Sequence, residues 1–310
     1  MKHCDLQQAF TPAKLIVSTV KTPAAALGFI PAIDSSYVFN EEFLNNVLLF
    51  LDKPLNDALY IAGPSGCGKT SAVLQIAARL KWSVEQVTFS NRSEVQDLLG
   101  HFSVQDRNVT FNYGPLSRAM LNGSILLLNE IDLVNPGDLA LLNDVIEGRP
   151  LCILQNGGEI VFPHPFFRVI ATANTKGSGD ESGFYNGTRI LNQAFLDRWR
   201  FIECCYPDEK VERILLKNKI PGLNGELIDK LLQFALELRR VSTERTESIG
   251  SLSAPFSTRV LLRLAGLLAQ SSKLNIYAAL DLAYASRLSQ IEREYVKRLC
   301  FDVFGSQERR

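Results

Sequence analysis

The sequence ALYIAGPSGCGKT at residues 58–70 decides the fold, because an apolar run leads directly into a glycine-rich turn. Residues 58–62 have the continuous apolar pattern of a buried strand. Behind the turn, residues 70–79 are rich in helix-forming residues, with apolar side chains at three- and four-residue spacings. The predicted order is therefore strand, loop, helix.

The turn matches G-x-x-x-x-G-K-[ST], which between a strand and a helix predicts a phosphate-binding P-loop. Its backbone N–H groups converge on phosphates, and the helix N-terminus adds positive potential. We expect Lys69 to reach the β- and γ-phosphates and the Thr70 hydroxyl to ligate Mg²⁺. The predicted nucleotide-binding residues are Gly63, Pro64, Ser65, Gly66, Cys67, Gly68, Lys69 and Thr70.

A second apolar run, residues 125–128, ends in Asn129 and Glu130. P-loop enzymes place carboxylates at such a strand end, where they face the metal and the attacking water. Asn129 stands where an aspartate is expected and remains a candidate metal ligand, while Glu130 is the candidate general base. The alternative is a polar loop that merely follows a buried strand.

Asn174 follows a third apolar run, residues 168–172, and is a candidate to hold the catalytic water or contact the γ-phosphate. The alternative is an ordinary turn-forming asparagine. Arg198 is a candidate arginine finger for a neighbouring subunit, an interaction that contributes roughly 10³–10⁵ in rate. Its alternative is structural pairing with Asp197 or Asp208.

Arg259 lies in the first turn of a predicted C-terminal helix, where a cation opposes the helix dipole. This unfavourable placement indicates another purpose, such as contacting nucleotide from the helical region. The alternative is a solvated side chain.

The 310 residues exceed the usual size of a single core, so we expect one large domain and one smaller one. Apolar runs that alternate with helical stretches predict an α/β parallel sheet. Residues 102–112 and 151–162 are expected to form hairpins, the first with its turn at Gln105-Asp106-Arg107-Asn108 and the second with a tight turn at Asn156-Gly157-Gly158.

After Pro207-Asp208 the strand signals stop and helical periodicity continues. We therefore expect an N-terminal segment at residues 1–40, an α/β nucleotide-binding domain at 41–207, and a small all-helical lid domain at 208–310.

Lysine plus arginine and aspartate plus glutamate each total 33, so bulk charge does not favour nucleic acid or an acidic membrane surface. No run approaches the roughly 18 apolar residues of a membrane span. Six sparse cysteines, two of them adjacent, predict free thiols and a reducing, cytoplasmic location.

The chain resembles AAA+ ATPases of the MoxR-like group, in particular the CobS-type ATPase subunits of aerobic cobaltochelatases. The resemblance covers roughly residues 29–270. Its most specific part runs from Ala171-Thr172-Ala173-Asn174 through Gly183-Phe184-Tyr185 to Asp197-Arg198-Trp199.

This resemblance implies ATP as the nucleotide, with Asn174 similar to sensor 1, Arg198 to the arginine finger and Arg259 to sensor 2. It also likens the two hairpins to the helix-2 and pre-sensor-1 insertions of the group. Asn129 departs from the family's aspartate, which bears on metal binding and on hydrolysis rate.

By this resemblance, we expect copies of the chain to form a ring, specifically a hexamer. The ring would hydrolyse ATP at its subunit interfaces and use the energy to remodel a protein partner. The resemblance suggests a partner with a von Willebrand A-type domain, and it leaves both a chelatase role and a generic chaperone role open. The alternatives are a DNA-handling motor or loader, which charge does not support, and a slow nucleotide-dependent switch.

Overall fold

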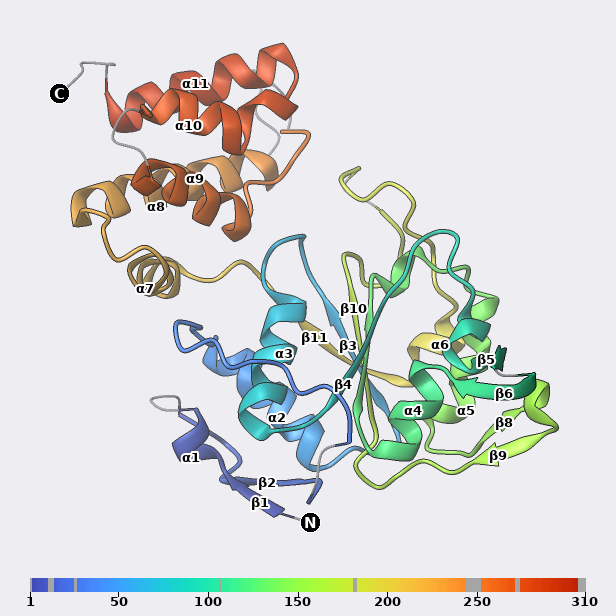
Figure 1. The fold of residues 1–310 in the computed structure, drawn as a ribbon. Coiled ribbons are helices and arrows are strands. Elements are labelled where there is room, and N and C mark those ends of the chain that lie inside the picture. Colours follow the sequence, from blue (N-terminus) through green and yellow to red (C-terminus); the bar gives the residue numbers. More distant parts are fainter. Residues whose placement is uncertain are drawn as a thin grey trace.

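The computed structural model describes residues 2–10, 14–24, 27–105, 107–180, 183–243, 252–270 and 274–305. Figure 1 shows an α/β part built around a central sheet and, joined to it through α7, a C-terminal group of helices. This is the predicted fold class of a P-loop sheet domain followed by a helical region. None of the helices in the described ranges is both long and apolar enough to cross a membrane.

The central sheet has five parallel strands in the order β11-β3-β10-β7-β4. Their bounds are β3 (Ala58–Ala62), β4 (Val84–Thr88), β7 (Ile125–Asn129), β10 (Arg168–Ala173) and β11 (Trp199–Glu203). The strands β3, β7 and β10 are buried along their whole length. Their continuous apolar pattern follows from burial on both faces.

Helices cover both faces of the sheet (Figure 1). On one face, Leu59 and Ile61 pack with helices α2 (Glu41–Asp52) and α3 (Lys69–Leu80). On the other face, Tyr60 belongs to a second core. The helices of that core are α4 (Pro115–Asn122), α5 (Asn143–Ile146) and α6 (Gln193–Leu196).

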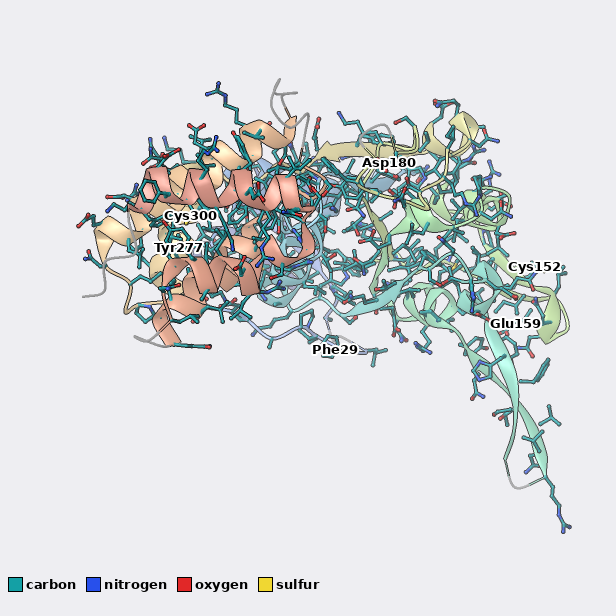
Figure 2. The ribbon with its side chains drawn as sticks, turned by 90° about the horizontal axis from the view of Figure 1, so that it is seen from above. Phe29, Cys152, Glu159, Asp180, Tyr277 and Cys300 are labelled. Carbon is teal, nitrogen blue, oxygen red and sulfur yellow. The ribbon has the colours of Figure 1, made fainter. Side chains whose placement is uncertain are left out.

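Both predicted hairpins are present. Strands β5 (Gly100–Gln105) and β6 (Asn108–Tyr113) form the first, which extends away from the rest of the molecule in Figure 2; Asp106 of its predicted turn lies outside the described residues. Strands β8 (Leu151–Ile153) and β9 (Glu159–Val161) form the second.

The turn of the second hairpin is longer than predicted. Residues Leu154–Asn156 form a 3₁₀ turn, and the positive φ angles fall at Gly157 and Gly158, at 66° and 77°. Because these glycines adopt the left-handed conformation without a Cβ penalty, they reverse the chain after the extra turn.

Within its described residues the C-terminal region contains helices and no strands, as predicted. It contains α7 (Glu209–Lys219), α8 (Gly225–Thr243), α9 (Thr258–Gln270), α10 (Ile276–Ala283) and α11 (Gln290–Phe304). These helices enclose a separate hydrophobic core. The domain boundary predicted at residue 207 falls in the connection between β11 and α7.

The first forty residues contain an element that the sequence did not predict. Strands β1 (Lys2–Asp5) and β2 (Thr19–Thr22) pair antiparallel, with the short helix α1 (Leu6–Ala9) between them. Leu6 and Val20 are fully buried in the core on the α2 side of the sheet.

Candidate functional site

The P-loop connects the end of β3 to the start of α3. Gly66 and Gly68 adopt φ angles of 76° and 106°, and Gly68 is the N-cap of α3. A methyl group placed on Gly66 would lie 2.7 Å from Ser257 Cβ, so glycine is also required there by close approach of the helical region. The backbone N–H groups at the α3 N-terminus suit an anionic phosphate.

The Lys69 side chain bridges the loop and a neighbouring strand end. Its ammonium group donates to Gly63 O at 2.6 Å, to Pro64 O at 3.1 Å and to Asn174 Oδ1 at 3.0 Å. The residue is 7% exposed. A buried cation held beside the loop is suited to binding phosphate.

Asn129 ends β7 with its amide oxygen directed at the P-loop. Its Oδ1 accepts from Thr70 Oγ1 at 2.6 Å and from Thr172 Oγ1 at 3.1 Å, while its Nδ2 donates to Val87 O. Two neutral oxygen ligands, Thr70 Oγ1 and Asn129 Oδ1, thus lie side by side. This donor set fits Mg²⁺, which is usually held by a few protein oxygens together with waters and phosphates.

Glu130 and Asn174 form a hydrogen-bonded pair at the carboxyl ends of β7 and β10. Asn174 Nδ2 donates to Glu130 Oε2 at 2.5 Å, so one amide links Glu130 to Lys69. Glu130 adopts a left-handed φ of 57°, an uncommon conformation for a residue with a side chain. Burial raises its pKa, and the nearby Asp132 carboxylate adds to this effect.

Asp132 holds the loop that carries Asn174, a role that was not predicted from the sequence. Its Oδ2 accepts from Asn174 N, Thr175 N and Thr175 Oγ1, each at 3.0 Å. Asp132 is fully buried, and burial raises its pKa. The feature of the sequence that could have indicated this role is a second carboxylate two residues after Glu130.

Two tyrosines, which also had no predicted role, hold Ser65 of the P-loop. Tyr185 Oη accepts from Ser65 N, and Tyr206 Oη donates to Ser65 O, both at 3.1 Å. Tyr185 lies in the Gly183-Phe184-Tyr185 run on which the family resemblance partly rests. No local pattern marks Tyr206.

The helical region brings Arg259 to the P-loop. A methyl group on Gly66 would lie 3.4 Å from Arg259 Cβ, which places the start of α9 against the loop. The adjacent Thr258 donates to Glu212 Oε1 at 2.6 Å, and Arg239 forms a bidentate ion pair with Glu212 at 2.7 and 2.9 Å.

Arg239 also links this ion pair to the P-loop through Tyr206. Its guanidinium carbon lies 4.5 Å from the centre of the Tyr206 ring, and Tyr206 in turn contacts Ser65. The start of α9 is therefore connected to the P-loop by a continuous set of polar and ring contacts.

Arg198 does not join this cluster. Its backbone carbonyl accepts from Ala58 N at the first residue of β3, whereas the P-loop follows the last residue of that strand. A strand of five residues is about 16 Å long. Arg198 Nε donates to Glu147 Oε1 at 2.5 Å. The structural partner of Arg198 is therefore Glu147, whereas the alternative named Asp197 or Asp208.

A cavity of about 480 Å³ opens beside the P-loop. Its walls include Cys67 and Gly68 of the loop, Tyr37 and Phe43 near the start of α2, and Tyr206 after β11. This volume lies within the range of small-molecule sites and is adjacent to the predicted phosphate site. The cavity is therefore suited to the nucleoside.

The family model described as AAA domain (dynein-related subfamily) matches residues 58–198. That segment begins with β3 and ends at Arg198, and it includes the P-loop, Asn129, Glu130 and Asn174.

Two relatives and one solved structure extend the comparison. The aerobic cobaltochelatase subunit CobS of a Sinorhizobium species is 27% identical over 307 residues, which cover 94% of this chain and 88% of CobS. The von Willebrand factor A domain-containing protein 8 of Mus musculus is 29% identical over 255 residues, covering 73% of this chain and 13% of that protein. A RuvB variant of Thermotoga maritima is similar in structure, with a TM-score of 0.47 and 16% identity, covering 87% of this chain and 74% of that chain.

Proposed function

We propose that this ATP hydrolase forms a ring and couples ATP hydrolysis to the remodelling of a partner protein. The proposal is supported by the match of residues 58–198 to the AAA domain model and by the similarity of the chain to CobS. The observation that carries this proposal is the convergence of four side chains on the P-loop. Lys69, Asn174 and Glu130 form one hydrogen-bonded chain, and Asn129 contacts Thr70 beside it.

Each of these residues has a distinct proposed role in hydrolysis. Lys69 and the loop N–H groups bind the phosphates, and Glu130 takes the proton of the attacking water. Asn174 orients the Glu130 carboxylate through its 2.5 Å hydrogen bond. Thr70 and Asn129 would hold Mg²⁺, which when bound neutralises charge on the β- and γ-phosphates.

Ring formation is supported by the position of Arg198. This residue lies near the amino end of β3, away from its own P-loop, so a phosphate contact requires the site of a neighbouring copy. We propose a hexamer in which Arg198 of one copy completes the site of the next. Arg259 contacts the nucleotide of its own chain from the helical lid.

The partner is proposed from the two named relatives. CobS is a subunit of an aerobic cobaltochelatase, and the mouse relative carries a von Willebrand A domain by name. A protein with such a domain is therefore the proposed partner, in a chelatase or in a chaperone of other proteins. The six free thiols support a reducing compartment, and we place the activity in the cytoplasm.

Trapping tests the proposal in the native cell with two tagged variants of the full chain. Glu130→Gln is expected to bind ATP without hydrolysing it, whereas Lys69→Ala is expected to bind ATP roughly 10- to 100-fold more weakly. A protein with a von Willebrand A domain should co-purify with Glu130→Gln only, and sedimentation should show a ring in ATP.

Two outcomes contradict this function. One is a Glu130→Gln protein that stays monomeric in saturating ATP, and the other is retention of the same proteins by both variants. DNA-stimulated hydrolysis, with binding that falls steeply as salt increases, would instead identify a DNA motor.

A further inference from the structure

Two thiols meet at the P-loop. Cys67 Sγ lies 3.4 Å from Cys204 Sγ, although the two residues are 137 positions apart in the chain. Both side chains line the 480 Å³ cavity next to the loop, and neither is in a disulfide. None of the proposed steps of ATP hydrolysis uses either sulfur atom.

The two cysteines belong to segments whose relative position matters for nucleotide binding. Cys67 lies in the P-loop between Gly66 and Gly68, immediately before α3. Cys204 follows β11, where its backbone N–H donates to Ala62 O at 2.7 Å, and it begins the connection to α7 and the helical region. A covalent bond between them would tie the phosphate loop to this connection.

We infer that Cys67 and Cys204 form a reversible disulfide when the protein meets an oxidant of the hydroperoxide class, and that this bond switches off ATP hydrolysis. The inference rests on nucleotide binding at the P-loop and does not depend on the ring or the partner proposed above.

The reaction balances in two steps. Cys67 sulfur attacks the peroxide, an S–O bond forms as the O–O bond breaks, and the released oxygen leaves as water when the peroxide is hydrogen peroxide. Cys204 sulfur then attacks Cys67 sulfur, the S–S bond forms, and the S–O oxygen leaves as a second water with the Cys204 proton. The two thiols are oxidised by two electrons, and the peroxide is reduced.

The surroundings of Cys67 favour it as the first nucleophile. The hydrogen bond with Cys204 and the nearby Lys69 ammonium lower the Cys67 pKa to about 7, although burial opposes this. The pKa of Cys204 is raised by the same hydrogen bond and by burial. The thiolate is the reactive form, so attack begins at Cys67.

Formation of the Cys67–Cys204 disulfide also gives a physical reason for the proposed loss of ATP hydrolysis. The sulfur atoms must move about 1.4 Å closer to go from 3.4 Å to the S–S bond length. Gly66 and Gly68 on either side of Cys67 let the loop follow this movement. A displacement of this size at a phosphate-binding loop is expected to lower ATP hydrolysis about 100-fold.

The remaining thiols provide matched controls. Cys205 is the exposed neighbour of Cys204 in sequence, and Cys152 is exposed on β8. Figure 2 shows Cys152 and Cys300 near opposite ends of the molecule, so these two cannot pair within one chain.

The test exposes the full chain to hydrogen peroxide and then measures linked peptides by mass spectrometry and ATP hydrolysis before and after dithiothreitol. In the wild type and in Cys205→Ser, a Cys67–Cys204 peptide should appear as hydrolysis falls about 100-fold, and dithiothreitol should reverse both changes. Cys204→Ser should form no such link and keep its own starting rate under the same exposure.

Three results would overturn the inference. The first is peroxide treatment that oxidises Cys152 without producing the Cys67–Cys204 peptide. The second is complete linkage with unchanged hydrolysis. The third is equal inactivation of Cys204→Ser, which would show that oxidation of Cys67 alone is sufficient and that no tether is involved.

Discussion

Asn129 stands where the resemblance to MoxR-like ATPases implies an aspartate, and the structure shows how an amide occupies the position. Its oxygen accepts from Thr70 and Thr172, and its nitrogen donates to Val87 O. An aspartate would keep the two oxygen contacts, but it has no donor for the Val87 carbonyl. The amide therefore suits the backbone around it while leaving less negative charge for a metal ion.

Replacing Asn129 by aspartate is expected to lower the Mg²⁺ concentration that gives half-maximal ATP hydrolysis. A full charge about 4 Å from a divalent cation is worth about 2 kcal/mol in a water-like dielectric, which corresponds to roughly a 30-fold change. Titration of steady-state phosphate release with Mg²⁺ measures this value. Maximal rate is a poorer readout, because a new carboxylate raises the pKa of the neighbouring Glu130.

Asn108→Asp supplies the control for that titration, because Asn108 is exposed on the projecting β5–β6 hairpin. This variant adds the same charge and should leave half-saturating Mg²⁺ unchanged. An Asn129→Asp protein with the wild-type value would mean that residue 129 does not help to hold the metal.

Lys69 and Glu130 are joined through Asn174, but we expect substitutions of the two residues to impair different steps, ATP binding for Lys69 and ATP hydrolysis for Glu130. Lys69→Ala should weaken ATP binding roughly 10- to 100-fold, since it removes a charged donor to phosphate. Glu130→Gln should bind ATP normally and lower turnover by roughly 10²–10⁴, because only proton transfer is lost. A fluorescent ATP analogue and single-turnover hydrolysis separate the two effects, and similar loss of affinity in both would refute the division of roles.

At the scale of elements, the start of α9 is placed against the P-loop by an ion pair from two other helices. Glu212 of α7 is 2% exposed and pairs with Arg239 of α8, while Thr258 at the start of α9 donates to the same carboxylate. The position of Arg259 follows from these contacts. Burial and the bidentate geometry make this pair different from the exposed ion pairs on the same helices.

Arg239→Ala is expected to destabilise the protein by about 3 kcal/mol, because it leaves the buried Glu212 carboxylate without its cation. ATP affinity should fall as well, since Tyr206 and Arg259 lose their support. Urea unfolding and nucleotide binding measure the two effects. Arg213→Ala is the matched control, because Arg213 joins α7 to α8 through exposed partners and should change little.

For the whole molecule, the separation between Arg198 and its own P-loop predicts catalysis shared between copies. Arg198→Ala should leave ATP binding intact and lower hydrolysis by roughly 10³–10⁵. Mixing it with Glu130→Gln should restore activity, since roughly a quarter of interfaces in a random equal mixture then hold both intact residues. Hydrolysis by the mixture, after mixed assemblies are confirmed, provides the measurement.

Glu147→Gln tests the alternative hypothesis that Arg198 has only a structural role, because Glu147 is the ion-pair partner of Arg198. If Arg198 acts only through this pair, Glu147→Gln should lower hydrolysis as much as Arg198→Ala does. A mixture that never exceeds the summed activities of its two components would also exclude sharing between copies.

Much of this organisation follows from local sequence. The apolar run before Gly63, the glycines of the loop and the helical spacing after Thr70 determine the strand, P-loop and α3, because each depends on residues a few positions apart. The same holds for both hairpins and for the helical C-terminal region. Asn129, Glu130 and Asn174 were predictable as a group, since the carboxyl ends of parallel strands share one edge of a sheet.

Tertiary structure alone decided which distant side chains complete the site. Tyr206 reaches Ser65 across 141 positions, Cys204 reaches Cys67 across 137, and Arg239 pairs with Glu212 on another helix. No local propensity encodes these contacts, because they arise only when β11 packs beside β3 and the helices form their own core. The sequence therefore determined the elements and the chemistry at their ends, whereas the packing of elements far apart in the chain selected the residues that hold the P-loop in place.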